Sequence, residues 1–348
     1  MVGSTVHPRS QPFISIVIPV FNMADGIRRC LRGIADQLVD DIEVLVVDDG
    51  SNDNTGMVVK EFAAKETRIH YLFQENAGVS SARNAGIEAA MGAYLLFIDA
   101  DDEVEKHYLQ NILERAKESR ADLLVWGIKR YRPNGRIEEW KPKMEGLYNR
   151  KSFLTALPAE QYGCHQGLYG FVPNKLVKKD LVDRFRLRFD TALSLMEDYD
   201  FFLGCYAHCE TILCFGETGY HYLASDGSDK PENRISVSYP QLIGVQNKCV
   251  NLLKKEGAWT TENEKLLFRT ICNLSLSFFL ETRDWRYSSI KSHLEYVWNS
   301  PYCISAIKQS ETRWRFLKRQ ILERNVFGTW VFVQAWRSYL SVRTRGMS

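Results

Sequence analysis

The sequence predicts an α/β fold built on a mainly parallel sheet, followed by a helical region. Short β-branched and aliphatic runs alternate with segments whose apolar residues recur every three or four positions, from Ile14 to about residue 129. Strands that alternate with helices pair in parallel, so this order indicates a doubly wound sheet. After Pro240 the apolar spacing is helical nearly to the end of the chain.

Each element has its own signal in the first 140 residues. The strands are predicted from aliphatic runs at residues 14–20, 42–47, 69–73, 94–98 and 122–129. The helices are predicted from amphipathic spacing at residues 26–38, 54–64, 79–90 and 107–119. Asn134 and Gly135 are typical of a hairpin turn, which would join residues 129–132 to 136–140.

The composition is that of an ordinary globular protein, with 45% hydrophobic and 25% charged residues among 348. A net charge of +2 gives no indication of nucleic-acid binding, so no nucleic-acid partner is predicted. No apolar stretch reaches the roughly 18 residues of a membrane span. The eight cysteines lack the spacing of a zinc site. Residues 1–12 are polar, lack a signal-peptide core and are predicted to be a flexible N-terminus.

Four carboxylates follow the predicted strand that ends at Ile98: Asp99, Asp101, Asp102 and Glu103. Ligands of open α/β sheets bind at the carboxyl ends of strands. Carboxylates this close repel each other unless a cation or hydrogen-bond donors share the site. The segment therefore indicates either a hard divalent cation that bridges to a substrate phosphate, or an acidic first turn of a helix.

Polar residues end two further strands, at Pro19 to Asn22 and at Asp48 to Ser51. The carboxyl ends of parallel strands lie along one edge, so these groups are expected to converge on one ligand. The segment from Asn76 to Asn84 opens the helix at 79–90 and is expected to bring Arg83 toward the same edge, where a guanidinium suits phosphate. A structural salt bridge to Asp48 or Asp99 is the alternative for Arg83. The absence of GxxxxGK[ST] excludes a P-loop, and the absence of GxGxxG after the first strand argues against a dinucleotide fold.

Four motifs, in this order, resemble those of the inverting family-2 glycosyltransferases with a GT-A fold. They are Pro19-Val20-Phe21-Asn22, Val47-Asp48-Asp49-Gly50-Ser51, Asn76 to Gly86, and Phe97-Ile98-Asp99-Ala100-Asp101-Asp102. Residues 174–179, Arg188 to Asp190 and Met196 to Phe201 resemble the segment that precedes and contains the family's catalytic-base motif. The resemblance covers about residues 12–240 and implies a GT-A fold of the bacterial polysaccharide type.

The resemblance implies roles for the matching residues. Asp198 would be the general base, and Glu197 would orient it or touch the acceptor. The donor nucleotide would be held by Pro19, Val20, Asn22, Asp48, Asp49, Arg83, Asp99 and Lys175. Asp99 and Asp101 match the D-x-D pair that binds Mn²⁺ or Mg²⁺. The chain departs from the family at Tyr220-His221-Tyr222-Leu223, which lacks the arginine of the family's segment. His221 would be a further metal ligand or phosphate contact there, and a packed or exposed histidine is the alternative.

The implied reaction moves a hexosyl or N-acetylhexosaminyl group from a nucleotide-diphospho-sugar, a UDP-sugar, to a hydroxyl of a glycan or lipid-linked acceptor. Such a transfer would serve polysaccharide biosynthesis at the cell envelope. One alternative is a nucleotidyltransferase, which would carry a Gly-rich basic loop where Phe21-Asn22-Met23 stand. The other is a nucleotide-sugar-binding scaffold without catalysis, which would have no need of a base such as Asp198.

The predicted domains are a catalytic domain at 13–240 and a helical region at 241–348. The catalytic domain would divide into a nucleotide-binding half at 13–130 and an acceptor half at 131–240, in which residues 225–238 would close over the donor. Residues 313–348 are rich in arginine and aromatic residues. This segment would either contact the inner face of the cytoplasmic membrane or pack on the catalytic domain, and the protein is expected to be cytoplasmic.

Overall fold

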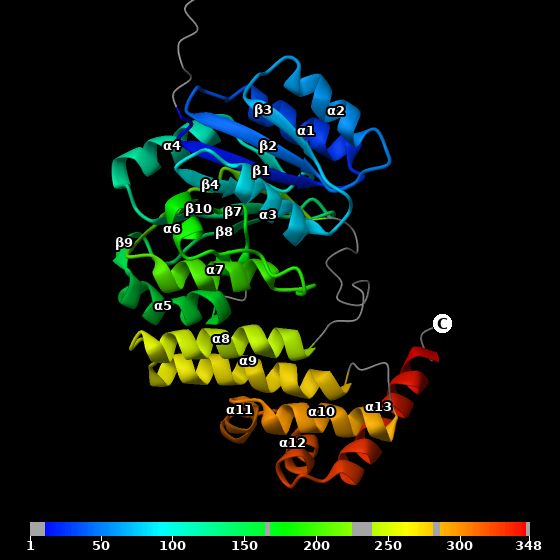
Figure 1. Ribbon diagram of the computed structural model, residues 1–348. Helices are drawn as coiled ribbons and strands as arrows, with labels where there is room; N and C mark the ends of the chain where they lie inside the picture. Colours follow the sequence, from blue (N-terminus) through cyan, green and yellow to red (C-terminus); the bar gives the residue numbers. More distant parts are fainter. Residues whose placement is uncertain (1–10, 164–167, 225–238, 281–285, 346–348) are drawn as a thin grey trace, which may run out of the picture. The chain divides into compact units, whose positions relative to one another are not determined.

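The computed structural model of the chain describes residues 11–163, 168–224, 239–280 and 286–345 (Figure 1). Most of the predicted N-terminal segment 1–12 and all of the predicted closing loop 225–238 lie outside the described residues. The chain divides into two compact units. Unit 1 comprises residues 1–156 and 166–235, and unit 2 comprises residues 157–165 and 236–348.

The larger sheet of unit 1 has the strand order β3-β2-β1-β4-β10-β6-β11-β9 in the part of the chain that is described. Its strands are β1 (Ile14–Val20), β2 (Ile42–Asp48), β3 (Ile69–Phe73), β4 (Tyr94–Phe97), β6 (Leu123–Val125), β9 (Gly146–Asn149), β10 (Lys175–Lys178) and β11 (Thr211–Cys214). Strands β1 to β4 are parallel, whereas β10 pairs in antiparallel fashion with both β4 and β6. The predicted mixed, mainly parallel sheet is confirmed.

Helices cover both faces of the parallel strands. Every residue of β1 and β2 is buried, as a sheet covered on both sides requires. The strand order reverses between β3 and β4, so right-handed crossovers put α1 (Ala24–Ala35) and α2 (Thr55–Ala63) on one face and α3 (Val79–Ala89) on the other (Figure 1). Helix α3 lies directly on β1, because a Cβ on Gly86 would meet Val17 Cγ1 at 2.2 Å.

A smaller sheet of unit 1 has the order β5-β12-β7-β8. Its strands are β5 (Glu103–Val104), β7 (Ile128–Tyr131), β8 (Ile137–Trp140) and β12 (Tyr220–Leu223). The predicted hairpin at Asn134-Gly135 is confirmed, because β7 and β8 pair in antiparallel fashion around it. The single predicted strand at 122–129 is wrong. The strand is interrupted at Gly127, where a Cβ would lie 2.7 Å from Trp140 O. The strands on either side, β6 and β7, belong to different sheets.

The remaining helices of this part of the chain are α4 (Tyr108–Ser119), α5 (Arg150–Gly163), α6 (Lys179–Arg184) and α7 (Glu197–His208), with a 3₁₀ turn at Leu168–Gly170. The acidic run Asp99 to Glu103 does not start a helix, since it leads into β5 and α4 begins only at Tyr108. The alternative of an acidic first helical turn is therefore wrong at this position. Glu197 and Asp198, in contrast, lie in the first turn of a helix, α7.

Unit 2 is helical where it is described, which confirms the predicted C-terminal helical extension. Its helices are α8 (Tyr239–Lys255), α9 (Thr261–Leu280), α10 (Tyr287–Asn299), α11 (Cys303–Gln309), α12 (Arg315–Leu322) and α13 (Val326–Arg345) (Figure 1). Helix α9 contacts α8, α10 and α11, and α13 contacts α10 and α12. None of the helices among the described residues combines the length and apolarity needed to cross a bilayer.

Candidate active site

Arg83 lies at the centre of an acidic cluster in unit 1. Its Nη1 is 2.6 Å from Asp198 Oδ1 and 3.8 Å from Glu197 Oε1, and its Nη2 is 3.0 Å from Asp99 Oδ1. The Arg83 side chain is 5% exposed, whereas those of Asp99 and Asp198 are 30% and 26% exposed. A shielded guanidinium therefore faces three carboxylates that remain partly open to solvent. The predicted alternative of a salt bridge from Arg83 to Asp99 is confirmed.

Three elements deliver these side chains. Asp99 follows β4, Arg83 stands on the second turn of α3, and Glu197 and Asp198 begin α7. The guanidinium of Arg83 lies 5.3 Å from the ring centre of Phe189, which stacks on Phe201 of α7 at 4.1 Å. These two stacked rings support the Arg83 side chain and hold its guanidinium in position. Contact between Arg83 and the α7 acids thus depends on residues 115 positions apart in the chain.

The cluster raises the pKa of Asp198 to about 7. Burial of the carboxyl is the main cause, and the nearby negative charges of Glu197 and Asp99 add to it, while Arg83 acts in the opposite direction. A carboxyl that titrates near neutral pH can take up a proton and release it again, which is the property required of a general base. The surroundings of Asp198 therefore suit proton transfer.

Of the four acids after β4, Asp102 is buried, Asp99 and Glu103 are half-buried, and Asp101 is exposed. Asp102 is fully buried and accepts hydrogen bonds from Tyr220 Oη at 2.5 Å and from the Leu223 amide at 2.9 Å. These bonds tie the acidic turn to β12. The Asp101 side chain is exposed overall, but its carboxyl is partly desolvated, and this desolvation together with the charge of Asp99 raises the pKa of Asp101. Asp102 is thus a structural residue, and Asp99 and Asp101 remain available to a cation.

The acids at the end of β2 hold the entrance to α3. Asp49 accepts hydrogen bonds from the amides of Ala77 and Gly78, at 2.9 and 2.8 Å, and from Gln74 Nε2 at 2.6 Å. Gly78 has a φ of 90°, a conformation that favours glycine, and it precedes the helix that carries Arg83. Asp49 therefore positions the loop that orients Arg83.

Asp48 is also engaged within the protein. Its carboxylate accepts bonds from Tyr71 Oη at 2.8 Å and from the Ser51 amide at 2.9 Å. Asn22 has a φ of 48° and joins two strand ends, since its Oδ1 accepts from the Asn52 amide and its own amide donates to Ser51 Oγ, both at 2.8 Å. The carbonyl of Val20 accepts from the Asp49 amide at 2.9 Å, and Pro19 is the preceding residue of β1. The predicted convergence of the ends of β1 and β2 is therefore present in the hydrogen bonds.

With this geometry described, the chain can be compared with known proteins. Residues 15–184 match the family model described as glycosyl transferase family 2. This part of the chain belongs to glycosyl transferase family 2. The matched range includes all four motifs of the nucleotide side, with Arg83, Asp99 and Asp101. Asp198 lies beyond it.

Several curated relatives of this family-2 domain are bacterial proteins named as glycosyltransferases. The chain is 30% identical over 218 residues to the uncharacterized glycosyltransferase EpsJ of Bacillus subtilis, which covers 62% of each protein. It is 26% identical over 265 residues to the poly(ribitol-phosphate) beta-glucosyltransferase of Bacillus spizizenii, covering 73% of this chain and 39% of that enzyme. The chain spans between 16% and 62% of the length of the first curated relatives that it matches.

The fold resembles that of a protein whose crystal structure is known. The structure of S. aureus TarS residues 1–349 in complex with UDP-GlcNAc matches with a TM-score of 0.69, covering 94% of this chain and 92% of that one. The sequence identity is 18%, so the match establishes the fold. The predicted GT-A fold with C-terminal helices is confirmed.

Lys175 of the family-2 domain occupies a different environment from the one predicted. Its side chain is fully buried, and its ammonium donates to the Leu168 carbonyl at 3.0 Å, to Asn174 Oδ1 at 2.7 Å and to the Phe171 carbonyl. An ammonium has three protons to donate, so these three acceptors use them all. Burial lowers the pKa of Lys175 well below its usual range, and the nearby charge of Asp198 partly offsets this. A direct contact from Lys175 to a donor phosphate would break this arrangement.

His221 also has a protein partner. Its Nε2 lies 3.1 Å from Glu105 Oε1, and its ring packs 4.9 Å from that of Tyr131. Within the described residues, no three His, Cys, Asp or Glu side chains gather closely enough to hold a metal ion by themselves, so the predicted set of Asp99, Asp101 and His221 does not form one cluster. Histidine pairing with Glu105 corresponds to the packed alternative.

Asn84, in the third of the family-2 motifs, had no predicted role. Asn84 Oδ1 accepts from the Phe189 amide at 2.8 Å, and Asn84 Nδ2 donates to the Phe189 carbonyl at 2.9 Å. These two hydrogen bonds hold the segment that places the Phe189 ring against the Arg83 guanidinium. The position of Asn84 next to Arg83, inside a motif that the resemblance already marked, was the signal for it in the sequence.

Proposed function

We propose that the chain is an inverting glycosyltransferase that moves a sugar from a UDP-sugar to a hydroxyl of a glycan or lipid-linked acceptor, with Asp198 as the general base. The observation that carries the proposal is the contact of Asp198 with Arg83. This contact links a carboxylate in the first turn of α7 to Asp99, which follows β4. The family-2 relationship of residues 15–184 supports the reaction class.

The reaction requires one proton acceptor and one site for a leaving diphosphate. The acceptor oxygen forms a bond to the anomeric carbon from the side opposite to the diphosphate, whose bond to that carbon breaks. The proton of the acceptor hydroxyl passes to Asp198. Arg83 engages Oδ1, so we assign Oδ2 to proton transfer. Arg83 also holds Asp99 and Asp198 apart at a fixed spacing, and its positive charge limits their mutual repulsion.

The carboxylates that follow β4 fit a hard divalent cation. Asp99 and Asp101 offer carboxylate oxygens, and Asp101 is exposed. Mn²⁺ or Mg²⁺ is typically held by one or two carboxylates together with substrate phosphates, so two acids are sufficient. Bound there, the ion would supply charge stabilisation for the leaving diphosphate. His221 is left out of the proposed ligand set because it pairs with Glu105.

The donor nucleotide is proposed on chemical and comparative grounds. TarS, which has the same fold, was crystallised with UDP-GlcNAc, and this supports a UDP-sugar with a hexosyl or N-acetylhexosaminyl group. The motifs around Pro19, Val20, Asn22, Asp48 and Asp49 would form the nucleotide side. Because the carboxylates of Asp48 and Asp49 are engaged within the protein, backbone groups of the same loops would make much of the contact to the base.

The domain limits are part of the proposal. Residues 13–240 would form the catalytic domain and residues 241–348 a helical region that supports it. Membrane contact by residues 313–348 stays a prediction. The side chains of Arg343 and Arg345, which belong to this segment, lie outside the described part of the structure. The aromatic side chains of this segment pack largely on one another, as in the contact of Trp314 with Trp336 at 4.6 Å.

A panel of nucleotide sugars tests the proposed function. A ligand held only by the native state at a hundredfold excess over its Kd stabilises that state by about 2.7 kcal/mol. We expect a UDP-sugar with Mn²⁺ to raise the thermal unfolding midpoint of the full chain, and GDP- and dTDP-sugars to leave it unchanged. The same UDP-sugar should release UDP when glycan acceptors are added. If no nucleotide sugar alters the midpoint, the proposed function is wrong.

The pH dependence of kcat/KM reports the ionisation of Asp198. Only the deprotonated carboxylate can accept a proton, and its pKa is raised to about 7. We expect kcat/KM to fall about tenfold per pH unit below neutral and to level off above it. The variant Glu197→Gln removes a negative charge that raises this pKa, so its acid limb should move to lower pH. An acid limb that stays in place in Glu197→Gln would argue against Asp198 as the titrating base.

A further inference from the structure

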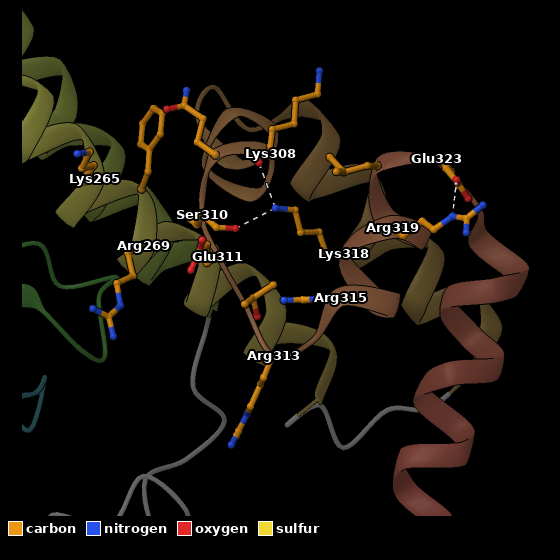
Figure 2. A pocket seen from close by; sticks show the side chains of 14 residues that line it. Lys265, Arg269, Lys308, Ser310, Glu311, Arg313, Arg315, Lys318, Arg319 and Glu323 are labelled. Atoms are coloured by element: carbon orange, nitrogen blue, oxygen red, sulfur yellow. Dashed lines mark hydrogen bonds and ion pairs between the residues drawn. The ribbon is translucent and has the colours of Figure 1, made fainter.

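A basic pocket lies entirely within unit 2. We define it by the first half of α9, the loop after α11 and one face of α12, which together line a cavity of about 1410 Å³ (Figure 2). Seven cationic side chains line it against two acidic ones, Glu311 and Glu323. The cationic residues are Lys265, Arg269, Lys308, Arg313, Arg315, Lys318 and Arg319. The pocket thus gathers positive charge from segments that are separate in the sequence.

Most of these cations have no carboxylate partner. Arg319 pairs with Glu323 at 2.7 Å, and Lys318 donates to the carbonyls of Ser310 and Lys308 at 2.8 and 3.1 Å. The other five are exposed and form no ion pair with any described residue. Glu311 stands among them without pairing to any described cation. Like charges that converge on one concave surface repel each other, and an anion bound there would relieve this repulsion.

The walls of the pocket are held in place by the fold. Lys318 ties α12 to the end of α11 through its two carbonyl bonds, which Figure 2 shows as dashed lines. Leu317 and Ile321 of α12 are fully buried, and Gln320 is nearly so. The face of α12 that carries Arg315, Lys318 and Arg319 therefore has a fixed orientation. The shape of the pocket is therefore set by the packing of the helices, and it does not depend on the positions of exposed side chains alone.

The arrangement of these cations fits a chain of anions better than it fits a membrane surface. A helix that lies on a membrane combines cations with exposed aromatic side chains on adjoining faces. Phe316 of α12 is exposed, but it contacts Phe332 of α13 at 5.6 Å and does not line the pocket. The pocket is concave, and its charges surround a recess. Guanidinium groups bind phosphate oxygens in pairs, and seven cations exceed what one phosphate can engage.

We propose that the basic pocket binds a phosphate-bearing polyanionic chain, at a site separate from the acidic cluster of unit 1. Arg269, Arg313 and Arg315 contact successive phosphate groups, and the lysines add positive charge around them. The binding is independent of the proposed sugar transfer. The pocket would also be a second binding site for the acceptor of the sugar, and this further role rests on the proposed function.

The test is a titration of a fluorescently labelled linear inorganic polyphosphate with the full chain, followed by anisotropy. The variant Arg269→Gln/Arg313→Gln/Arg315→Gln removes three unpaired cations, and we expect its affinity to fall about tenfold or more. The control Arg136→Gln/Lys255→Gln/Lys291→Gln loses the same charge at exposed positions outside the pocket, and its affinity should stay within about twofold. The salt dependence of binding should be less steep in the pocket variant than in the control.

Two further measurements separate the alternatives. All three proteins should keep the same thermal unfolding midpoint, because the substituted residues are exposed, and the same stabilisation by a UDP-sugar. Vesicles of phosphatidylglycerol and phosphatidylcholine test the membrane alternative. Equal loss of affinity in both variants, or unchanged affinity in the pocket variant, would overturn the proposal. Binding of the vesicles without binding of polyphosphate would also overturn it.

Discussion

The variant Asp198→Asn is expected to lose sugar transfer while it keeps donor binding. An amide has the shape of the carboxyl but cannot accept the proton of the acceptor hydroxyl, so turnover should fall by about 10²–10⁴-fold. The donor contacts proposed for the ends of β1, β2 and β4 are unchanged, so the Kd for the UDP-sugar should stay within about twofold. Single-turnover transfer and a thermal-shift titration with the donor measure the two quantities.

Asp180→Asn is the matched control for this experiment. Asp180 is an exposed carboxylate of α6 that pairs with Arg184, and the same change of group there should leave turnover intact. Retained turnover in Asp198→Asn would identify a different base. Lost turnover together with lost donor binding would mean that Asp198 serves the donor site. The scaffold alternative is favoured only if wild-type chain binds the donor and shows no transfer to any acceptor.

Removing Arg83 is expected to have the largest effect on stability. In Arg83→Met the carboxylates of Asp99, Glu197 and Asp198 lose the cation between them while staying largely buried. Breaking a buried ion pair by deleting one partner costs about 3–5 kcal/mol. Urea denaturation at neutral pH should show this loss in the free energy of unfolding. Arg83→Lys keeps the charge but not the planar fork, so a smaller loss is expected.

The pH dependence of this variant checks the mechanism. In the wild type, Arg83 opposes the rise in the pKa of Asp198, which stands at about 7. Without this cation the pKa of Asp198 rises further above its unfolded value of about 4, so the folded variant takes up this proton at a higher pH than the wild type does. The part of the stability deficit that comes from Asp198 should therefore be largest at alkaline pH and should shrink as the pH falls towards about 7. A deficit that is constant with pH would assign the loss to packing against Phe189 instead.

The parallel half of the fold could be predicted because its signals are local. Each aliphatic run and each helical repeat between residues 14 and 119 is read within one element, and the strand ends then follow from topology. The break at Gly127 could not be predicted in this way, since it depends on the approach of Trp140 from another strand. The insertion of β10 between β4 and β6 is equally non-local.

The same distinction applies to the site. The resemblance marked Arg83, Asp99 and Asp198 separately, but only the fold joins Arg83 to Asp198 across 115 positions. Lys175 looked like a phosphate contact because it is basic and lies in a motif. Its surroundings are set by the carbonyls of Leu168 and Phe171, which no spacing rule connects to a buried ammonium. Charge type is visible in the sequence, whereas burial and partner choice come from tertiary packing.

The position of β10 affects how the chain can fold during its synthesis. Strand β4 pairs with β1 on one side and with β10 on the other, and β10 is formed by residues 175–178. When the ribosome has released only the first 130 residues, β4 therefore has an open edge of unpaired amides and carbonyls. Open edges of this kind recruit other strands, so nascent chains that stall before residue 178 should be the species that need a chaperone.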